Sequence, residues 1–210
     1  MSAPKNIATG LSKIGMLLRA SDWARAESSG LTPTQAQILV FLVSRGPARV
    51  TAVADEIGVT QPTASDSVAA LVRKAMVEKR RDPADARAML LHPTPTGRRI
   101  AGEAAVWPDA LLAAIDVLEP AEQAAFLKGL MKMIRTLQVR GAIPVQRLCV
   151  SCRHFRPNEH EGTDNPHHCA FVDAAFGDAD LRLDCGDHEP ADDTDASALW
   201  AAFASATAAE

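Results

Sequence analysis

The stretch from Thr51 to Val77 contains two helical patterns separated by a glycine, and it restricts the fold more than any other feature of the chain. The first pattern, TAVADEI, is short; Thr51 can cap its start and Gly58 can supply the turn that follows. The second pattern begins at Thr60, a good N-cap, and tolerates Pro62 in its first turn. A short helix, a glycine turn and a longer helix predict a helix-turn-helix.

The two faces of the second helix differ in character. On a helical wheel Ala64, Val68 and Leu71 share the inward face, whereas small polar side chains occupy the start of the other. Such a helix can enter a DNA major groove, where short polar side chains reach base edges. The residues of this helix that we predict to contact DNA are Thr60, Gln61, Thr63, Ser65, Asp66 and Arg73.

The sequence MVEKRRDPADARAMLLHPTPTG, which follows this helix, predicts a β-hairpin. Short residues around Pro83 and Asp85 make the turn, and residues 88–91 form the return strand. A hairpin behind a recognition helix is a wing. Arg81, Asp85 and Arg87 are its candidate DNA-binding residues, and Lys79 and Arg80 add positive charge. The alternative is a charged hairpin that contacts only solvent.

Helical patterns flank this region on both sides, so the fold class that we predict is mainly α. The ranges are 6–27 and 34–46 before it, then 96–118, with a break at Pro108, and 119–139. The first and last of these helices are amphipathic and can pack together within one chain or across a two-fold axis. Residues 1–148 carry a net charge of +6 and residues 149–210 one of −10, which favours a nucleic-acid partner for the first part only.

The stretch from Ala75 to Gly97, together with the order of elements over about residues 5–140, resembles the MarR family of winged-helix transcriptional regulators. The resemblance rests on Asp82, Asp85, Arg87, Leu90, Thr94 and Gly97. It implies a homodimer built from the terminal helices that binds a palindromic operator in double-stranded DNA, most often as a repressor. It also implies that Arg87 reaches the minor groove, that Asp85 positions Arg87, and that a small-molecule effector can bind.

Two features depart from the family pattern. Ala75 stands where the family usually has glycine, and Asp66 and Ala70 occupy recognition-helix positions that often hold arginine. An acidic side chain facing the groove repels phosphates, although it can also accept a hydrogen bond from a cytosine amino group. These departures affect affinity and operator sequence rather than the fold.

All four cysteines lie beyond the family pattern, at Cys149, Cys152, Cys169 and Cys185, in the spacing C-x2-C-x16-C-x15-C. This segment has few apolar residues, so we expect a cross-link rather than a large core to order it. Four thiolates suit an iron–sulfur cluster or a zinc ion. We therefore predict a small cysteine-rich metal-binding segment over residues 147–190, after a winged-helix and dimerisation domain over residues 1–146.

The spacing favours an iron–sulfur cluster, because only the first cysteine pair has the CxxC form common in structural zinc sites. It is similar to the motif of high-potential iron–sulfur proteins, with Phe155 three residues after Cys152. A 4Fe–4S cluster is our first choice and 2Fe–2S our second; zinc is the alternative, and a Cys149–Cys152 thiol switch is a third reading. A histidine at 167 or 168 can replace one cysteine ligand.

The last segment, residues 191–210, begins as an acidic linker and continues as a short helix with Leu199, Trp200 and Phe203. We expect this helix to dock on its own protein, with a partner-binding peptide as the alternative. The chain lacks an apolar run long enough for a membrane span and a secretion signal, so we expect a cytoplasmic protein.

The function that these features predict is a DNA-binding transcriptional regulator whose cluster senses redox state or iron. The same regulator with structural zinc and a small-molecule effector pocket is the alternative. No nucleophile–base pair or phosphate loop supports catalysis, so we predict that the chain is not an enzyme; a redox or electron-transfer protein is the competing class.

Overall fold

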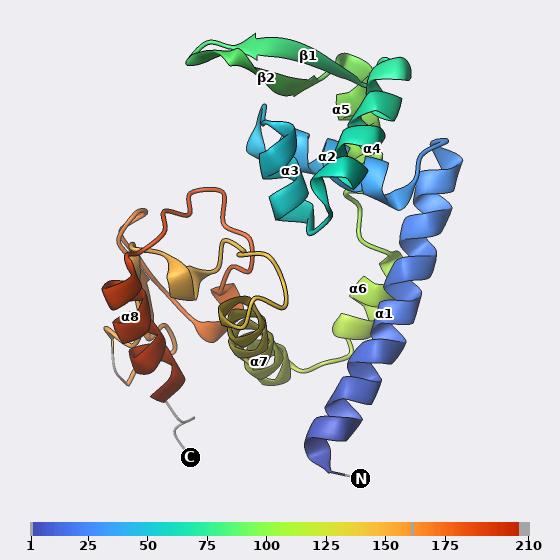
Figure 1. Cartoon of the computed structure of the whole chain (residues 1–210). Coiled ribbons are helices and arrows are strands. Elements are labelled where there is room, and N and C mark those ends of the chain that lie inside the picture. The colour runs from blue at the N-terminus through green and yellow to red at the C-terminus, as the bar shows by residue number, and fades with distance from the viewer. Residues whose placement is uncertain (1, 161, 206–210) are drawn as a thin grey trace. The chain divides into compact units, whose positions relative to one another are not determined.

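The computed structural model describes residues 2–160 and 162–205, which divide into two units at Leu112/Ala113 (Figure 1). The first unit holds α1 (Ala3–Ser28), α2 (Pro33–Arg45), α3 (Val50–Ile57), α4 (Gln61–Arg73), β1 (Val77–Asp82), β2 (Asp85–Pro93) and α5 (Pro95–Ala104). α6 (Asp109–Ile115) spans the boundary. The second unit holds α7 (Pro120–Val139), η1 (Cys149–Ser151), β3 (Phe155–Arg156), β4 (His167–Cys169), β5 (Ala174–Phe176), η2 (Asp178–Asp180) and α8 (Asp193–Ser205). The mainly helical class is confirmed, and no helix among the described residues is long and apolar enough to cross a membrane.

The core of the first unit is built around α2. Thr32 and Gln35 form a reciprocal capping box at its start, and Gly46, with φ of 85°, ends it as predicted. Ile38, Leu39 and Leu42 of α2 pack with buried residues of α3, α4, α5 and the two strands. This core supports α3 and α4 from behind and leaves the opposite face of α4 in solvent.

The helix-turn-helix forms as predicted, with one correction at its start. α3 begins at Val50 with Arg49 as its N-cap, so Thr51 lies inside the helix and the prediction of a Thr51 cap is wrong. Arg49 takes the cap position because Ala48 is held by a bridge to Leu91, which brings the chain into the helix earlier. Gly58 has a left-handed φ of 69° and makes the turn, as expected.

The hairpin is a two-stranded antiparallel wing that projects beyond α3 and α4 (Figure 1). β2 starts at Asp85, three residues earlier than predicted, because the strands pair down to Asp82 and Asp85 with an irregularity next to the turn. Ala48 adds a third short stretch by pairing with Leu91. The base of the wing is thereby attached to the core, and its tip extends into solvent.

Ala75 occupies a position that glycine would fill with less strain. It follows α4 with a left-handed φ of 52°, and the amide of Met76 donates to the Leu71 carbonyl while that of Ala75 donates to Val72. These two hydrogen bonds define a Schellman motif, whose left-handed residue is usually glycine. The left-handed backbone at position 75 thus explains why the MarR resemblance implies a glycine there.

Replacing Ala75 by glycine is expected to raise the free energy of unfolding by about 1 kcal/mol. Left-handed backbone costs an alanine roughly 1–2 kcal/mol, which exceeds the extra entropy of glycine in the unfolded chain. Urea unfolding followed by circular dichroism measures the change. Ala70→Gly, the same substitution inside α4, is the control and is expected to lower stability by about 1 kcal/mol. A change in the free energy of unfolding with the same sign in both variants would contradict the prediction.

Gly97 of α5 is required for a different reason, namely close contact. A Cβ atom at this position would lie 2.1 Å from the carbonyl oxygen of Met76 and 3.3 Å from Leu39 Cδ2. Gly97→Ala is therefore expected to lower the free energy of unfolding by about 1–3 kcal/mol. Gly102→Ala in the same helix is the matched control, because nothing lies within 4 Å of a Cβ there, and it is expected to stabilise. Thermal unfolding of both variants tests this contrast.

The second unit has its own hydrophobic core, which the sequence reading underestimated. Met131 of α7, Phe203 of α8 and Leu148, Phe155 and Leu181 of the cysteine segment are buried together. The segment uses few apolar residues, but helices on either side of it in the sequence complete its core. The predicted division after residue 146 therefore differs from the observed one, because α7 packs with the cysteine segment.

α8 docks on its own unit, as expected for the tail helix. The Phe203 ring is fully buried and lies 5.9 Å, centroid to centroid, from Phe155 and 5.7 Å from His167. Lys128 and Lys132 of α7 place their ammonium groups 5.5 and 5.8 Å from the same ring centroid. Phe203 therefore joins α7, α8 and the cysteine segment. Residues 206–210, the end of the predicted tail segment, lie outside the described residues.

Candidate nucleic-acid interface and metal centre

α4 presents its polar side chains to solvent and its apolar ones to the core. Thr60 caps the helix through its hydroxyl, which accepts from the Thr63 amide at 3.3 Å. Ala64, Val68 and Leu71 are fully buried, as predicted. The predicted contact residues Gln61, Thr63, Ser65, Asp66 and Arg73 are all exposed. The face that we assigned to DNA is therefore free in the described chain.

Two acidic residues that flank the turn of the wing contact Arg49, the N-cap of α3. The Asp82 carboxylate accepts from Arg49 Nη2 at 2.7 Å, and Asp85 lies 3.3 Å from the same nitrogen. The hydrogen bond from Arg49 holds the pKa of Asp82 below its usual range. Asp85 Oδ1 also accepts from the backbone amide of Arg87 at 3.1 Å. Asp85 thus orients the backbone at Arg87, and the contact of Arg49 with the wing turn is one that sequence reasoning missed.

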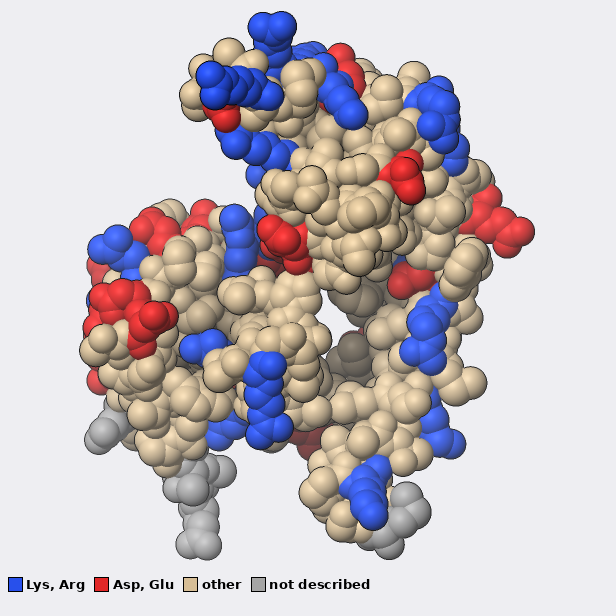
Figure 2. All heavy atoms as spheres, in the orientation of Figure 1, with Lys and Arg blue, Asp and Glu red and all other residues tan. Residues whose placement is uncertain are grey.

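Positive charge gathers on the wing strands, as the space-filling view shows (Figure 2). Lys79, Arg80, Arg81 and Arg87 are exposed there. Arg80 is paired with Glu78 on the same strand, whereas Arg81 and Arg87 have no salt bridge within the described residues. The wing therefore offers free guanidinium groups in the same unit as the polar start of α4.

The comparisons with known proteins agree with this geometry. The model of the MarR family matches residues 29–88, from just after α1 into β2. Residues 29–88 are of the MarR type. Among curated proteins, no relative matches the chain.

Solved structures of MarR-like regulators share the fold. The Staphylococcus aureus MepR–DNA complex is 19% identical, with a TM-score of 0.54 over 63% of this chain and 98% of that one. BldR of Sulfolobus solfataricus, a transcriptional regulator, is 25% identical, with a TM-score of 0.50 over 65% and 99%. Bordetella bronchiseptica BpsR, whose DNA binding is regulated by 6-hydroxynicotinic acid, is 24% identical, with a TM-score of 0.51 over 63% and 96%. These likenesses support a MarR-type winged-helix regulator and leave about a third of the chain unmatched.

In the second unit, outside the MarR-type match, all four cysteines line one cavity of about 350 Å³. Cys149 and Cys152 come from η1 and its C-cap, Cys169 from β4, and Cys185 from the loop after η2. All four are free thiols. Residues separated by up to 36 positions in the chain therefore converge, as the sequence hypothesis requires.

The wall of this cavity is mainly apolar, with a few polar groups. Its apolar lining consists of Phe155, Phe171, Val172, Ala174, Ala175 and Phe176. The backbone amide of Arg182 donates to Cys149 Sγ at 3.3 Å, and its guanidinium lies 3.8 Å from Cys185 Sγ. Such N–H···S contacts stabilise negative charge on sulfur. Burial raises the pKa of the Cys149 thiol to about 11, so this thiol is protonated at neutral pH when no metal is bound.

The histidines have different environments from those that we predicted for ligands. His154 lines the cavity, with its Nε2 atom 3.3 Å from a Glu189 carboxylate oxygen. Neither His167 nor His168, our two candidates to replace a cysteine, lines it. Both belong to β4, and their rings form hydrogen bonds elsewhere, His167 with Asp178 and His168 with His160.

His167 is fully buried and joins the cysteine segment to α7. Its Nδ1 atom accepts from the Asn158 amide at 3.2 Å, so its Nε2–H donates to Asp178 Oδ1 at 2.9 Å. Asp178 Oδ2 accepts from Lys128 of α7 at 2.9 Å. Burial lowers the pKa of His167, which is therefore neutral near pH 7. Burial opposes ionisation of Asp178, but hydrogen bonds from His167 and Lys128 outweigh it and hold its pKa below the usual range. Sequence reasoning missed this network, because nothing local pairs the three residues.

Proposed function

We propose that the chain is a DNA-binding transcriptional regulator, a repressor, that binds a palindromic operator as a homodimer. The observation that carries this proposal is that one unit holds both an exposed polar start of α4 and a wing with free arginines. A recognition helix of this kind reads base edges in the major groove, and a basic wing contacts phosphates or the minor groove. The likeness to the MepR–DNA complex supports the same use of the fold.

Exposed apolar side chains on the terminal helices support the homodimer. Trp23 and Ile7 of α1 are 63% and 55% exposed, and Phe126, Met133 and Leu137 of α7 are 40–44% exposed. A monomer seldom exposes so many large apolar groups on two helices without a partner for them. A second copy of the chain covers such surfaces with two-fold symmetry, which matches a palindromic site.

Selection of bound fragments from random double-stranded DNA tests the DNA-binding function. We expect enrichment of a palindrome whose half-sites are about one helical turn apart. Fluorescence anisotropy should then show that affinity falls steeply with salt concentration. DNA binding without sequence preference would contradict the proposal. So would a protein that is monomeric at the concentrations where it binds DNA.

We further propose that the four cysteines hold an iron–sulfur cluster, with 4Fe–4S as the first choice. A single zinc ion at about 2.3 Å from each sulfur requires sulfurs about 3.8 Å apart. Among the described residues, one group of three has its ligand atoms within 4.8 Å of one another, and it consists of Glu159, His160 and His168. No three cysteine sulfurs in the described chain are therefore as close together as a single zinc ion requires. Wider spacing around a cavity of about 350 Å³ suits a cluster, whose irons bind cysteines at its periphery.

A cluster held by the four cysteines can act on the regulator through α7. Met131 of α7 packs in the same hydrophobic core as the cysteine segment. Lys128 of α7 donates a hydrogen bond to Asp178, which also accepts one from His167. If α7 also forms the dimer, a change in cluster state alters the helix that sets the spacing of the recognition helices. The cluster supplies redox chemistry, while these residues transmit its state.

Operator affinity of the cluster-loaded and cluster-free dimers tests this sensing role. Equal affinity, with the dimer intact in both forms, would contradict it. A colourless protein with one zinc ion per chain would favour the alternative of a structural metal and a small-molecule effector, as the regulation of BpsR suggests. Catalytic turnover in the absence of DNA would instead favour a redox protein.

A further inference from the structure

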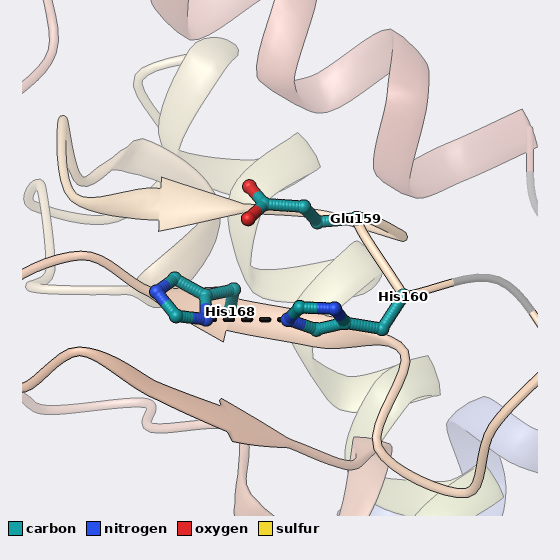
Figure 3. Close-up of side chains that lie close together, drawn as sticks. All are labelled: Glu159, His160 and His168. Carbon is teal, nitrogen blue, oxygen red and sulfur yellow. Dashed lines mark hydrogen bonds between the residues drawn. The ribbon is translucent and has the colours of Figure 1, made fainter.

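Glu159, His160 and His168 form a cluster of metal-ligating side chains that is separate from the cysteine cavity. One ring nitrogen or carboxylate oxygen of each lies within 4.8 Å of the others. Glu159 and His160 come from the loop after β3, His168 comes from β4, and a hydrogen bond joins a ring nitrogen of His160 to one of His168 (Figure 3). We propose that these three residues bind a zinc ion, which makes the second unit a carrier of two different metal centres.

The distance between the two rings suits a shared metal ion. His160 Nε2 lies 3.2 Å from His168 Nδ1. Two imidazole nitrogens at 2.0–2.1 Å from a tetrahedral zinc ion are about 3.3 Å apart, so zinc can enter with little movement of either ring. Glu159 is exposed, and one of its carboxylate oxygens lies within 4.8 Å of a ring nitrogen of each histidine. This carboxylate serves as the third ligand. A water molecule can complete the coordination.

A carboxylate lies beside the outer nitrogen of the His168 ring. His168 Nε2 lies 3.3 Å from Asp173 Oδ1. A negative charge at this position favours the tautomer that carries its proton on Nε2, which leaves the lone pair on Nδ1, the nitrogen nearest His160. In the absence of metal, His160 Nε2 and His168 Nδ1 are joined by a hydrogen bond, and zinc binding requires His160 to carry its proton on Nδ1 instead of Nε2.

The backbone holds the ligands close together before any metal binds. The His160 amide donates to the Pro166 carbonyl at 3.0 Å, and the Thr163 hydroxyl donates to the His160 carbonyl at 3.0 Å. His168 pairs with Arg156 across β3 and β4. Both ends of the loop that carries the ligands are therefore anchored, which reduces the entropy lost on binding.

The site is independent of the cysteine cavity but close to the contacts of α8. None of the three ligands lines the cavity. Asn158, next to Glu159, donates from its side chain to the Ala202 carbonyl of α8 at 2.8 Å and from its amide to His167. Zinc at Glu159 and His160 therefore steadies the loop that holds α8.

Isothermal titration of the full-length protein, as purified with its metal content known, with zinc chloride tests the proposal. We expect one zinc ion per chain in the wild type, none in H160Q or H168Q, and about tenfold weaker binding in E159Q. H92Q, a matched histidine substitution on the wing, is expected to bind as the wild type does. Full zinc binding by both H160Q and H168Q would overturn the proposal.

X-ray absorption at the zinc edge provides a second readout that does not depend on variants. Coordination by nitrogen and oxygen alone is expected, whereas sulfur in the first shell would place the zinc at the cysteines and overturn the assignment. Iron and sulfide content should be the same in H160Q, H168Q and the wild type. That measurement separates failure of this site from failure of the proposed cluster, and circular dichroism confirms that each variant is folded.

Discussion

Cys185→Ser is expected to remove nearly all iron and sulfide from the protein and to abolish its broad visible absorption. Cys185 is one of four sulfurs around the same cavity, and a serine hydroxyl is a poor replacement for a thiolate at iron. The variant should also be less stable, because Cys152 and Phe155, which line the cavity, belong to the core of this unit. Anaerobic purification followed by iron, sulfide and zinc analysis measures the effect.

His154→Gln is the matched control inside the same cavity. His154 lines the wall but is not one of the proposed ligands, so the variant should retain its iron, sulfide and colour. If H154Q lost the cluster and C185S retained it, His154 and not Cys185 would be the fourth ligand. Stoichiometric zinc and no iron in the wild type would contradict the cluster itself.

Arg87→Ala is expected to weaken operator binding by about tenfold for each wing, and thus on the order of a hundredfold for a dimer that carries two. Arg87 is exposed, has no salt bridge within the described residues, and has its backbone fixed by Asp85. Because its guanidinium is free in this structure, DNA gains the contact without breaking another. Fluorescence anisotropy at several salt concentrations measures both the affinity and its salt dependence.

Lys13→Ala removes the same charge from an exposed position on α1 and serves as the control. It should leave operator affinity within about twofold of the wild type. A phosphate contact through Arg87 would also lower the slope of log affinity against log salt by about one for each wing. Equal affinities for R87A and K13A would contradict a DNA contact by the wing arginine.

The winged helix could be predicted from the sequence because its signals are local. Caps such as Thr60, the glycine turn at Gly58 and the spacing of Ala64, Val68 and Leu71 act within a few residues. The Thr51 cap failed because a contact distant in sequence, Ala48 with Leu91, moved the start of α3. Local signals are thus accurate until a tertiary contact competes with them.

The sequence by itself determined the helix-turn-helix, the wing and the grouping of the cysteines in one segment. Only the tertiary structure decided that α7 and α8 complete the core of that segment, that all four cysteines line one cavity, and that His160 faces His168. It also decided that His167, adjacent to His168, is buried against Asp178. The reason is physical: periodicity and capping depend on neighbours along the chain, whereas a metal site or a buried hydrogen-bond network depends on side chains that only packing brings together.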